Sequence, residues 1–257
     1  MTTEAWGDRK ALLVVGHGTN DEAGRREFAQ VVAMAASRLP SVVVEPCFLE
    51  LAKPAIAEGL ARCVDRGARH VTVLPLLLFS AEHARHDIPK AIAAVPAGRD
   101  VHLEYAGTLD CHPAVLELSA IRFREALAST LDPDSGDKIT LVFVGRGSTD
   151  HQACDEFCRF ARLRCEQTKV SRLETCYLAM AEPNFERVLD AAENLPCRRI
   201  VVQSHLLFHG QLFDRVSEAV ARRRKVGSEH RWVVTQPLGV HGLLVDAMID
   251  IAGQTVG

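Results

Sequence analysis

Blocks of apolar and polar positions alternate along the chain in a way that predicts strands and helices in turn. Between residues 21 and 39, apolar side chains recur at helical spacing on one face, and acidic residues lie in the first turn. Residues 54–66 form a second predicted helix, with a proline at its start and Gly67 just past its end. Short β-rich runs predict strands at 11–15, 41–48, 70–79 and 101–105. Nearly continuous apolar strands joined by helices indicate a parallel sheet covered on both faces.

The same succession of segments starts again after residues 130–138, whose composition is typical of a turn or linker. An offset of 129 residues carries the first half onto the second without a gap, and it pairs Gly16 with Gly145, Gly18 with Gly147, Asp21 with Asp150, Phe28 with Phe157, Pro54 with Pro183 and His112 with His241. We therefore predict an α/β protein with two tandem domains, 1–130 and 138–257, each a small parallel four-stranded sheet with helices on both faces. In such sheets ligands bind beyond the carboxyl ends of the strands, and in a duplicated protein the natural site is a cleft between the halves.

Composition narrows the class of protein. The 257 residues are 47% apolar and 25% charged with a net charge of -3, which is typical of a soluble globular protein and argues against nucleic acid or a membrane surface as the main partner. The N-terminus lacks a signal-peptide core and the longest apolar run is too short to span a bilayer, so we expect a cytoplasmic protein. The eight cysteines are scattered, and Cys154 and Cys158, one helical turn apart, have only weak metal-ligand spacing. In a reducing compartment, cysteines are expected to serve as small buried apolar residues.

A histidine held between two glycines ends the first predicted strand, in the segment "LLVVGHGTND". His17 would lie at the sheet edge where ligands bind, and the flanking glycines allow a sharp turn that leaves the imidazole accessible. One alternative is a loop histidine that caps the following helix. A phosphate loop is another, but the segment lacks both the Gly-x-Gly-x-x-Gly spacing and a Gly-Lys-Ser/Thr ending.

Two further polar groups follow the neighbouring predicted strands. Glu50 follows the second strand, and the third is followed by a cluster of Glu82, His83, His86 and Asp87. Each of these residues alone could equally be a surface side chain. Together, two imidazoles and a carboxylate at one edge suit a borderline divalent metal such as Co²⁺, Fe²⁺, Ni²⁺ or Zn²⁺. Neither a His-Glu-x-x-His motif nor a Gly-x-Ser-x-Gly motif is present, so metal-assisted hydrolysis and serine chemistry are not favoured.

The segments "GHGT", "FLELAKPAI" and "LLLFSAEHARHDIP", with "YLAMAEPNF" and "SHLLFHGQLFD" in the second half, resemble the sirohydrochlorin chelatases of the two-domain CbiX type. This family inserts cobalt or iron into a tetrapyrrole. The resemblance implies that His17 and His83 are catalytic and bind the metal, that Glu50 is the acidic ligand, and that neither ATP nor a redox cofactor is used. It also implies a divalent metal ion and sirohydrochlorin as substrates. Cobalt, for cobalamin synthesis, is favoured over iron, for siroheme synthesis, and Ni²⁺ suits the same ligands.

The second copy lacks the proposed metal ligands, since the offset replaces His17, Glu50 and His83 by Arg146, Ala179 and Leu212. We therefore expect one active site, with the second domain as the facing wall of the cleft in a protein that could be monomeric. Arg146 would hold carboxylates of the tetrapyrrole, although a solvated loop arginine is an equal alternative.

Further expectations concern proton transfer and metal delivery. His17 would accept protons from the macrocycle, and Asp87 would either orient His83 or cap a helix. His205 and His209 could store or deliver metal, or simply be hydrogen-bonded near the apolar strand. The rival functions are a non-catalytic metal or tetrapyrrole carrier and a histidine-dependent hydrolase.

Overall fold

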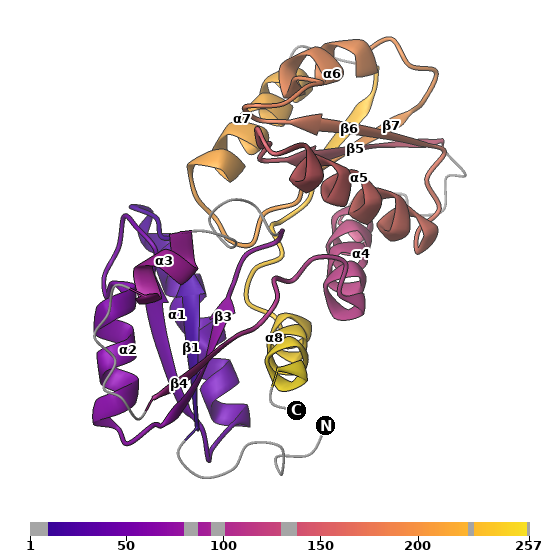
Figure 1. Ribbon diagram of the computed structural model, residues 1–257. Coiled ribbons are helices and arrows are strands. Elements are labelled where there is room, and N and C mark those ends of the chain that lie inside the picture. The colour runs from indigo at the N-terminus through magenta and orange to yellow at the C-terminus, as the bar shows by residue number, and fades with distance from the viewer. Residues whose placement is uncertain (1–9, 80–86, 94–100, 130–137, 226–228, 256–257) are drawn as a thin grey trace. The chain divides into compact units, whose positions relative to one another are not determined.

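The computed structural model describes residues 10–79, 87–93, 101–129, 138–225 and 229–255, and within these ranges it contains two parallel four-stranded sheets with helices (Figure 1). The first sheet has the order β2-β1-β3-β4, built from β1 (Lys10–Gly16), β2 (Val43–Phe48), β3 (His70–Pro75) and β4 (His102–Tyr105). The second has the order β6-β5-β7-β8, built from β5 (Ile139–Gly145), β6 (Arg172–Tyr177), β7 (Arg199–Ser204) and β8 (Arg231–Val234). The predicted α/β class and the duplicated parallel sheets are confirmed.

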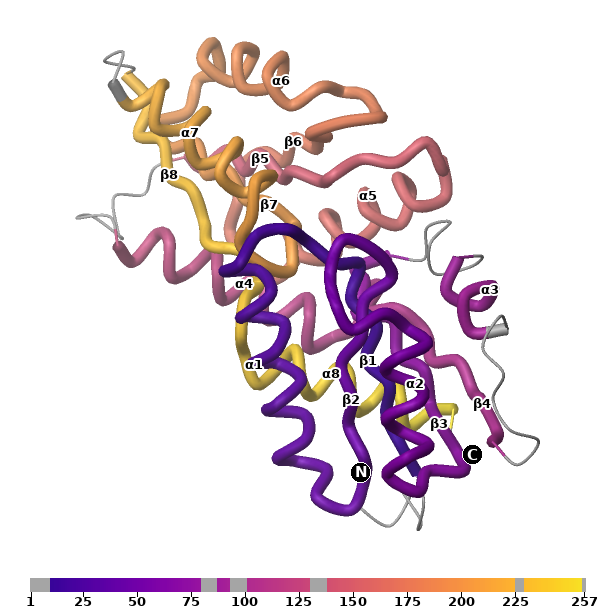
Figure 2. Tube along the Cα trace, turned by 90° about the vertical axis from the view of Figure 1, so that its left-hand side faces the viewer, coloured from indigo at the N-terminus to yellow at the C-terminus, as the bar shows by residue number. Residues whose placement is uncertain are grey.

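The central strand of the first sheet is covered on both faces because its apolar run points side chains alternately to each. Leu13 and Val15 pack against Ile56 and Leu60 of α2 (Ile56–Asp65), on the face that also holds α3 (Ile88–Ala93). On the opposite face, Phe28 of α1 (Glu22–Arg38) packs closely over Gly16. The same face carries α8 (Gly242–Gln254), which lies against α1 and β3 (Figure 2). This alternation explains why β1 reads as a nearly continuous apolar run.

The second sheet is built in the same way. One of its faces packs against α6 (Phe185–Ala192) and α7 (Gln211–Lys225), through residues such as Val142 and Val144. The other face carries α5 (His151–Glu166) and α4 (Pro113–Ala128), where the Gln203 side-chain amide donates to the Ser119 carbonyl oxygen at 2.7 Å. Each sheet is therefore a three-layer α/β unit.

The compact units differ from the sequence repeats by one helix each. One unit comprises residues 1–114 and 240–257, and the other comprises residues 115–239. Most of α4, the last helix of the first repeat, thus belongs to the second unit, and α8, the last helix of the second repeat, belongs to the first. The predicted boundaries 1–130 and 138–257 describe the duplication of the sequence, whereas the packing exchanges the final helices.

The start of α2 differs slightly from the sequence prediction, and the two repeats share a proline conformation there. The helix predicted from residue 54 begins at Ile56, because Ala55, its N-cap, still has an extended backbone conformation. Pro54 lies in the preceding loop and follows a cis peptide bond. Pro183 has the same conformation before α6. No helix among the described residues combines the length and apolar character needed to cross a bilayer.

Candidate metal centre

Two loops at the carboxyl edge of the first sheet touch through their backbones. Gly18 has a φ of 101°, and a Cβ added to it would lie 1.7 Å from the carbonyl oxygen of Glu50. The Glu50 N–H donates to the carbonyl oxygen of His17 at 3.1 Å. A residue with a side chain at position 18 would push these loops apart, so the glycine allows the approach.

This approach brings two of the predicted metal ligands together. His17 Nε2 lies 3.5 Å from Glu50 Oε1, and the two side chains are 26% and 51% exposed. The imidazole and the carboxylate are therefore neighbours that remain accessible to solvent. A pair of this kind can hold a borderline divalent ion while leaving other coordination positions open.

The helix-capping alternative for His17 is wrong. Asp21 is the N-cap of α1, and its side chain accepts a hydrogen bond from the Gly24 N–H at 2.9 Å. The Thr19 hydroxyl accepts from the Asp21 N–H at 3.0 Å, which completes the turn before the helix. The helix start is thus satisfied without the imidazole of His17.

The third predicted ligand, His83, lies outside the described residues, as do Glu82 and His86. Its strand, β3, pairs with β1 in parallel up to Pro75, so the chain leaves the sheet at the same edge as His17. Asp87 lies exposed immediately before α3. In the part of the chain that the structure describes, no group of three His, Cys, Asp or Glu side chains could hold a metal ion. His83 as third ligand and Asp87 as its orienting residue stay predictions.

The second repeat keeps the loop geometry without the ligands. A Cβ on Gly147 would lie 1.7 Å from the carbonyl oxygen of Ala179, and the Ala179 N–H donates to the Arg146 carbonyl oxygen at 2.9 Å. The Arg146 residue is exposed, and Leu212 packs against the core of its own unit. The two-glycine turn therefore belongs to the fold, and the imidazole and carboxylate are specific to the first repeat.

The sequence pattern did not draw attention to an exposed leucine that follows Glu50. Leu51 has a φ of 60° and is 57% exposed, next to Glu50. Met180, its counterpart, has a φ of 59° and is also 57% exposed. A single apolar residue in a polar loop gives no periodic signal, and only its recurrence at the repeat offset could have drawn attention to it.

The two histidines considered for metal storage have different surroundings. His205 is 3% exposed, and its ring lies 4.1 Å from that of Phe160 and 5.5 Å from that of Phe143. Burial lowers the pKa of His205 to about 3. Its position in an aromatic core favours a structural role rather than metal storage. His209 is half-buried, with Nε2 3.0 Å from the Gln236 side-chain oxygen.

His205→Leu is expected to make the free energy of unfolding less dependent on pH under acidic conditions. Leucine is the residue at the matching buried position 76. The unfolded chain, with a histidine pKa near 6.5, binds a proton that the folded chain does not, so stability falls as pH drops below 6.5. This loss amounts to about 2 kcal/mol between about pH 7.5 and pH 5. Urea unfolding at both pH values measures it, and an equal loss in the variant would contradict the assignment.

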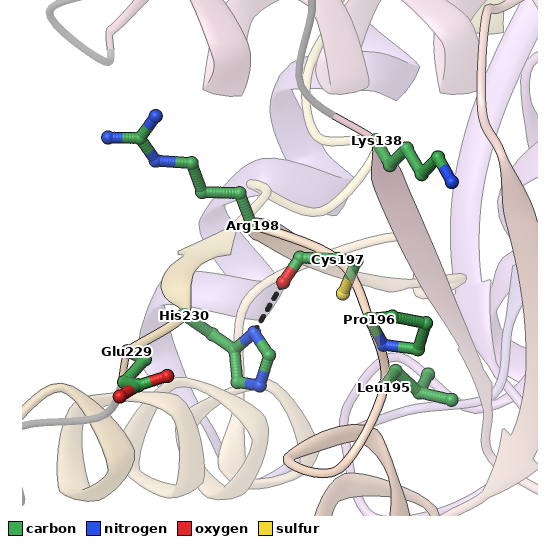
Figure 3. Close-up of a pocket in the computed structure, with 7 residues that line it drawn as sticks. All are labelled: Lys138, Leu195, Pro196, Cys197, Arg198, Glu229 and His230. Atoms are coloured by element: carbon green, nitrogen blue, oxygen red, sulfur yellow. Dashed lines mark hydrogen bonds between the residues drawn. The ribbon is translucent and has the colours of Figure 1, made fainter.

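A separate pocket lies at the other edge of the second sheet (Figure 3). It is lined by residues that directly precede β5, β7 and β8, namely Lys138, Leu195, Pro196, Cys197, Arg198, Glu229 and His230. The Lys138 and Arg198 side chains extend in different directions and do not converge on a common point (Figure 3). Because these are the amino ends of parallel strands, the pocket is not part of the ligand-binding edge of its sheet.

Comparison with known proteins identifies relatives over almost the whole chain. The CbiX family matches residues 11–126 and 140–255. The sirohydrochlorin cobaltochelatase of Priestia megaterium is 32% identical over 82% of this chain and 68% of its own, and the sirohydrochlorin ferrochelatase of the same organism is 28% identical over 90% and 85%. The structure of SirB from Bacillus subtilis with Fe³⁺ matches with a TM-score of 0.85, at 26% identity over 97% of this chain and 96% of that one.

Proposed function

The chain belongs to the CbiX family, and on that premise we propose that it is an enzyme that inserts a divalent metal ion into sirohydrochlorin. The observation that carries this function is the contact between His17 and Glu50, an accessible imidazole and carboxylate at the ligand-binding edge of a parallel sheet. Cobalt is the favoured metal and iron the next, since the relatives include both a cobaltochelatase and a ferrochelatase. The metal ion is a substrate of the proposed reaction.

Metal insertion requires that metal-bound water be removed and that two ring N–H protons be lost. We propose that His17, Glu50 and His83 bind the incoming ion through a partial shell whose remaining positions face the macrocycle. Once the ion has passed from its imidazole to the ring nitrogens, His17 would accept one ring proton, and the other would leave to solvent. The geometry supports this role because Nε2 lies beside the Glu50 carboxylate, which can stabilise the imidazolium once it forms.

Leu51, the residue after Glu50, adds an exposed apolar side chain to the loop that carries the proposed acidic ligand. Its side chain is held outward, and it neighbours the carboxylate of Glu50 in the sequence. A tetrapyrrole presents a flat apolar face around polar nitrogens, so an apolar side chain beside a polar metal site suits that substrate better than it suits a phosphate ester. This surface therefore favours a chelatase over a hydrolase.

A metal-insertion assay separates the enzyme from a carrier that uses the same residues. Sirohydrochlorin is mixed with Co²⁺ or Fe²⁺ with and without protein, and the change in its absorption spectrum is followed over time. Catalysed insertion well above the background rate is the expected result. Tight binding of metal or tetrapyrrole without any acceleration would favour the carrier and overturn the proposed function.

Arg146→Ala is expected to raise the KM for sirohydrochlorin about tenfold while changing kcat little. We propose that this exposed guanidinium binds an acetate or propionate group of the substrate, and a charge-assisted hydrogen bond of this kind contributes about 1.5 kcal/mol or more. Initial rates at several sirohydrochlorin concentrations measure the effect, with exposed Arg159→Ala on α5 as the control. An unchanged KM for Arg146→Ala would leave the residue as a solvated loop arginine.

A further inference from the structure

Two cysteines one helical turn apart on α5 share a polar neighbour on β6. Cys158 Sγ lies 3.4 Å from the Tyr177 hydroxyl and 4.0 Å from the Thr175 hydroxyl. The Tyr177 hydroxyl donates to the carbonyl oxygen of Cys154 at 3.3 Å, and Cys154 Sγ lies 3.4 Å from the carbonyl oxygen of Ser148. Both cysteines therefore lie at one place between α5, β6 and the loop that follows β5.

The Tyr177 hydroxyl contacts both residues, Cys158 through its sulfur and Cys154 through its carbonyl oxygen. Burial raises the pKa of its phenol, and the neighbouring thiols of Cys158 and Cys154 raise it further. The phenol therefore stays protonated at neutral pH and serves as a hydrogen-bond donor. Cys154 and Cys158 are four residues apart on α5, and side chains at this spacing have Cβ atoms about 5–6 Å apart, so both sulfur atoms can turn toward one ion.

The first repeat shows that the fold does not require this cluster. At the offset of 129 residues, Cys154 and Cys158 correspond to Arg25 and Ala29, while Tyr177 and Thr175 correspond to Phe48 and Pro46. Arg25 Nη1 donates to the carbonyl oxygen of Thr19 at 3.0 Å, so it fills the structural role that Cys154 has beside Ser148. All four sulfur and hydroxyl groups are thus specific to the second repeat.

Three of the other cysteines are buried as the composition predicts. Cys47, Cys63 and Cys176 are fully buried, and burial raises the pKa of the Cys63 and Cys176 thiols to about 12. These thiols stay neutral and serve as small apolar groups. Cys154 and Cys158, in contrast, are partly exposed, so an ion can reach them from solvent.

We propose that Cys154 and Cys158 form a binding site for a soft, thiophilic cation, for which Cu⁺ is the representative ion. Thiolates are the ligands that select such ions, and Cu⁺ accepts two of them without further protein ligands. Binding forms two Cu–S bonds and releases the two thiol protons to solvent. The Thr175 hydroxyl can donate to the Cys158 thiolate, while Tyr177 holds the Cys154 backbone through its carbonyl oxygen. The site differs in chemistry from the nitrogen and oxygen ligands of His17 and Glu50, so the second repeat carries a metal preference of its own.

The test measures Cu⁺ binding directly and needs no insertion assay. The reduced full-length protein is titrated anaerobically with Cu⁺ in competition with a chromophoric Cu⁺ chelator. One tight equivalent is expected, and Cys154→Ser or Cys158→Ser is expected to weaken it at least ~100-fold. Cys197→Ser, which removes another partly exposed thiol, and His17→Ala are expected to bind Cu⁺ like the unmodified protein.

A second variant tests whether lost Cu⁺ binding could result from misfolding. Cys154→Arg combined with Cys158→Ala installs the residues that the first repeat carries in the same backbone, and it should lose the tight equivalent while retaining its unfolding midpoint. Tight Cu⁺ binding that persists in this folded double variant would overturn the proposal. Loss of binding in Cys197→Ser instead would place the ion elsewhere and overturn it as well. Neither result bears on metal insertion at His17.

Discussion

His17→Ala is expected to lower kcat for cobalt insertion into sirohydrochlorin about a thousandfold while leaving the fold intact. The substitution removes the proposed metal ligand and the proposed proton acceptor together, and a positioned acid or base alone contributes about 10²–10⁴ in rate. The backbone bond from Glu50 to the His17 carbonyl oxygen does not involve the imidazole, so the loop should persist. The loss should remain at saturating Co²⁺, because added metal replaces neither the ligand geometry nor the base.

A matched histidine controls for nonspecific effects. His70 is exposed at the amino end of β3, the sheet edge opposite to His17, and His70→Ala should insert cobalt at the unmodified rate. Glu50→Gln should show a smaller defect than His17→Ala that added Co²⁺ partly relieves, because the amide keeps an oxygen ligand but loses the charge. Unchanged turnover of His17→Ala at saturating metal would remove His17 from the mechanism.

Gly18→Ala is expected to reduce the free energy of unfolding of the first unit by about 3 kcal/mol and to abolish most insertion activity. About 1 kcal/mol comes from placing a side chain at a φ of 101°, and the remainder from a Cβ that meets the Glu50 carbonyl oxygen at 1.7 Å. The loops must separate, which moves His17 away from Glu50. Urea unfolding and the insertion assay on the same preparation measure the two effects.

Two other glycines distinguish the cost of a positive φ from the cost of a steric clash. Gly67 has a φ of 90°, but a Cβ added there has no neighbouring atom within 4 Å, so Gly67→Ala should cost only about 1 kcal/mol and keep full activity. Gly147→Ala meets the Ala179 carbonyl oxygen at 1.7 Å, so it should destabilise the second unit as strongly while leaving the His17–Glu50 pair in place. Equal stability of Gly18→Ala and Gly67→Ala would refute the role of loop contact.

The meeting of His17 and Glu50 could be predicted because it depends on topology. Both residues follow strands that run in the same direction in one sheet, and parallel strands bring their carboxyl ends to one edge. The glycines at 16 and 18 recur at 145 and 147, which separated the turn required by the fold from the histidine added to it. Apolar runs likewise predicted the strands, but the strand predicted at 70–79 ends at Pro75.

Features that depend on long-range packing could not be predicted in this way. The helices at 113–128 and 242–254 have apolar surfaces that suit either sheet, so nothing in their local pattern indicates which one they cover. His205 follows an apolar strand and looks like an edge residue, but the chain stays in the core for one more position, as Leu76 does in the first repeat. Burial at that position is set by the phenylalanines of α5, which are distant in the sequence.

The assignment of α8 to the first unit and of most of α4 to the second gives the chain a property that separate halves would lack. If two separate chains exchanged their last helices, only non-covalent association would hold them together. Dilution would then favour dissociation of the two chains. Here the traded helices are covalently joined to the units that receive them, so the exchange is an intramolecular event with a fixed effective concentration. Its extent should be the same at nanomolar and micromolar protein. Cleavage of the chain between residues 130 and 138 would turn that fixed equilibrium into a concentration-dependent one.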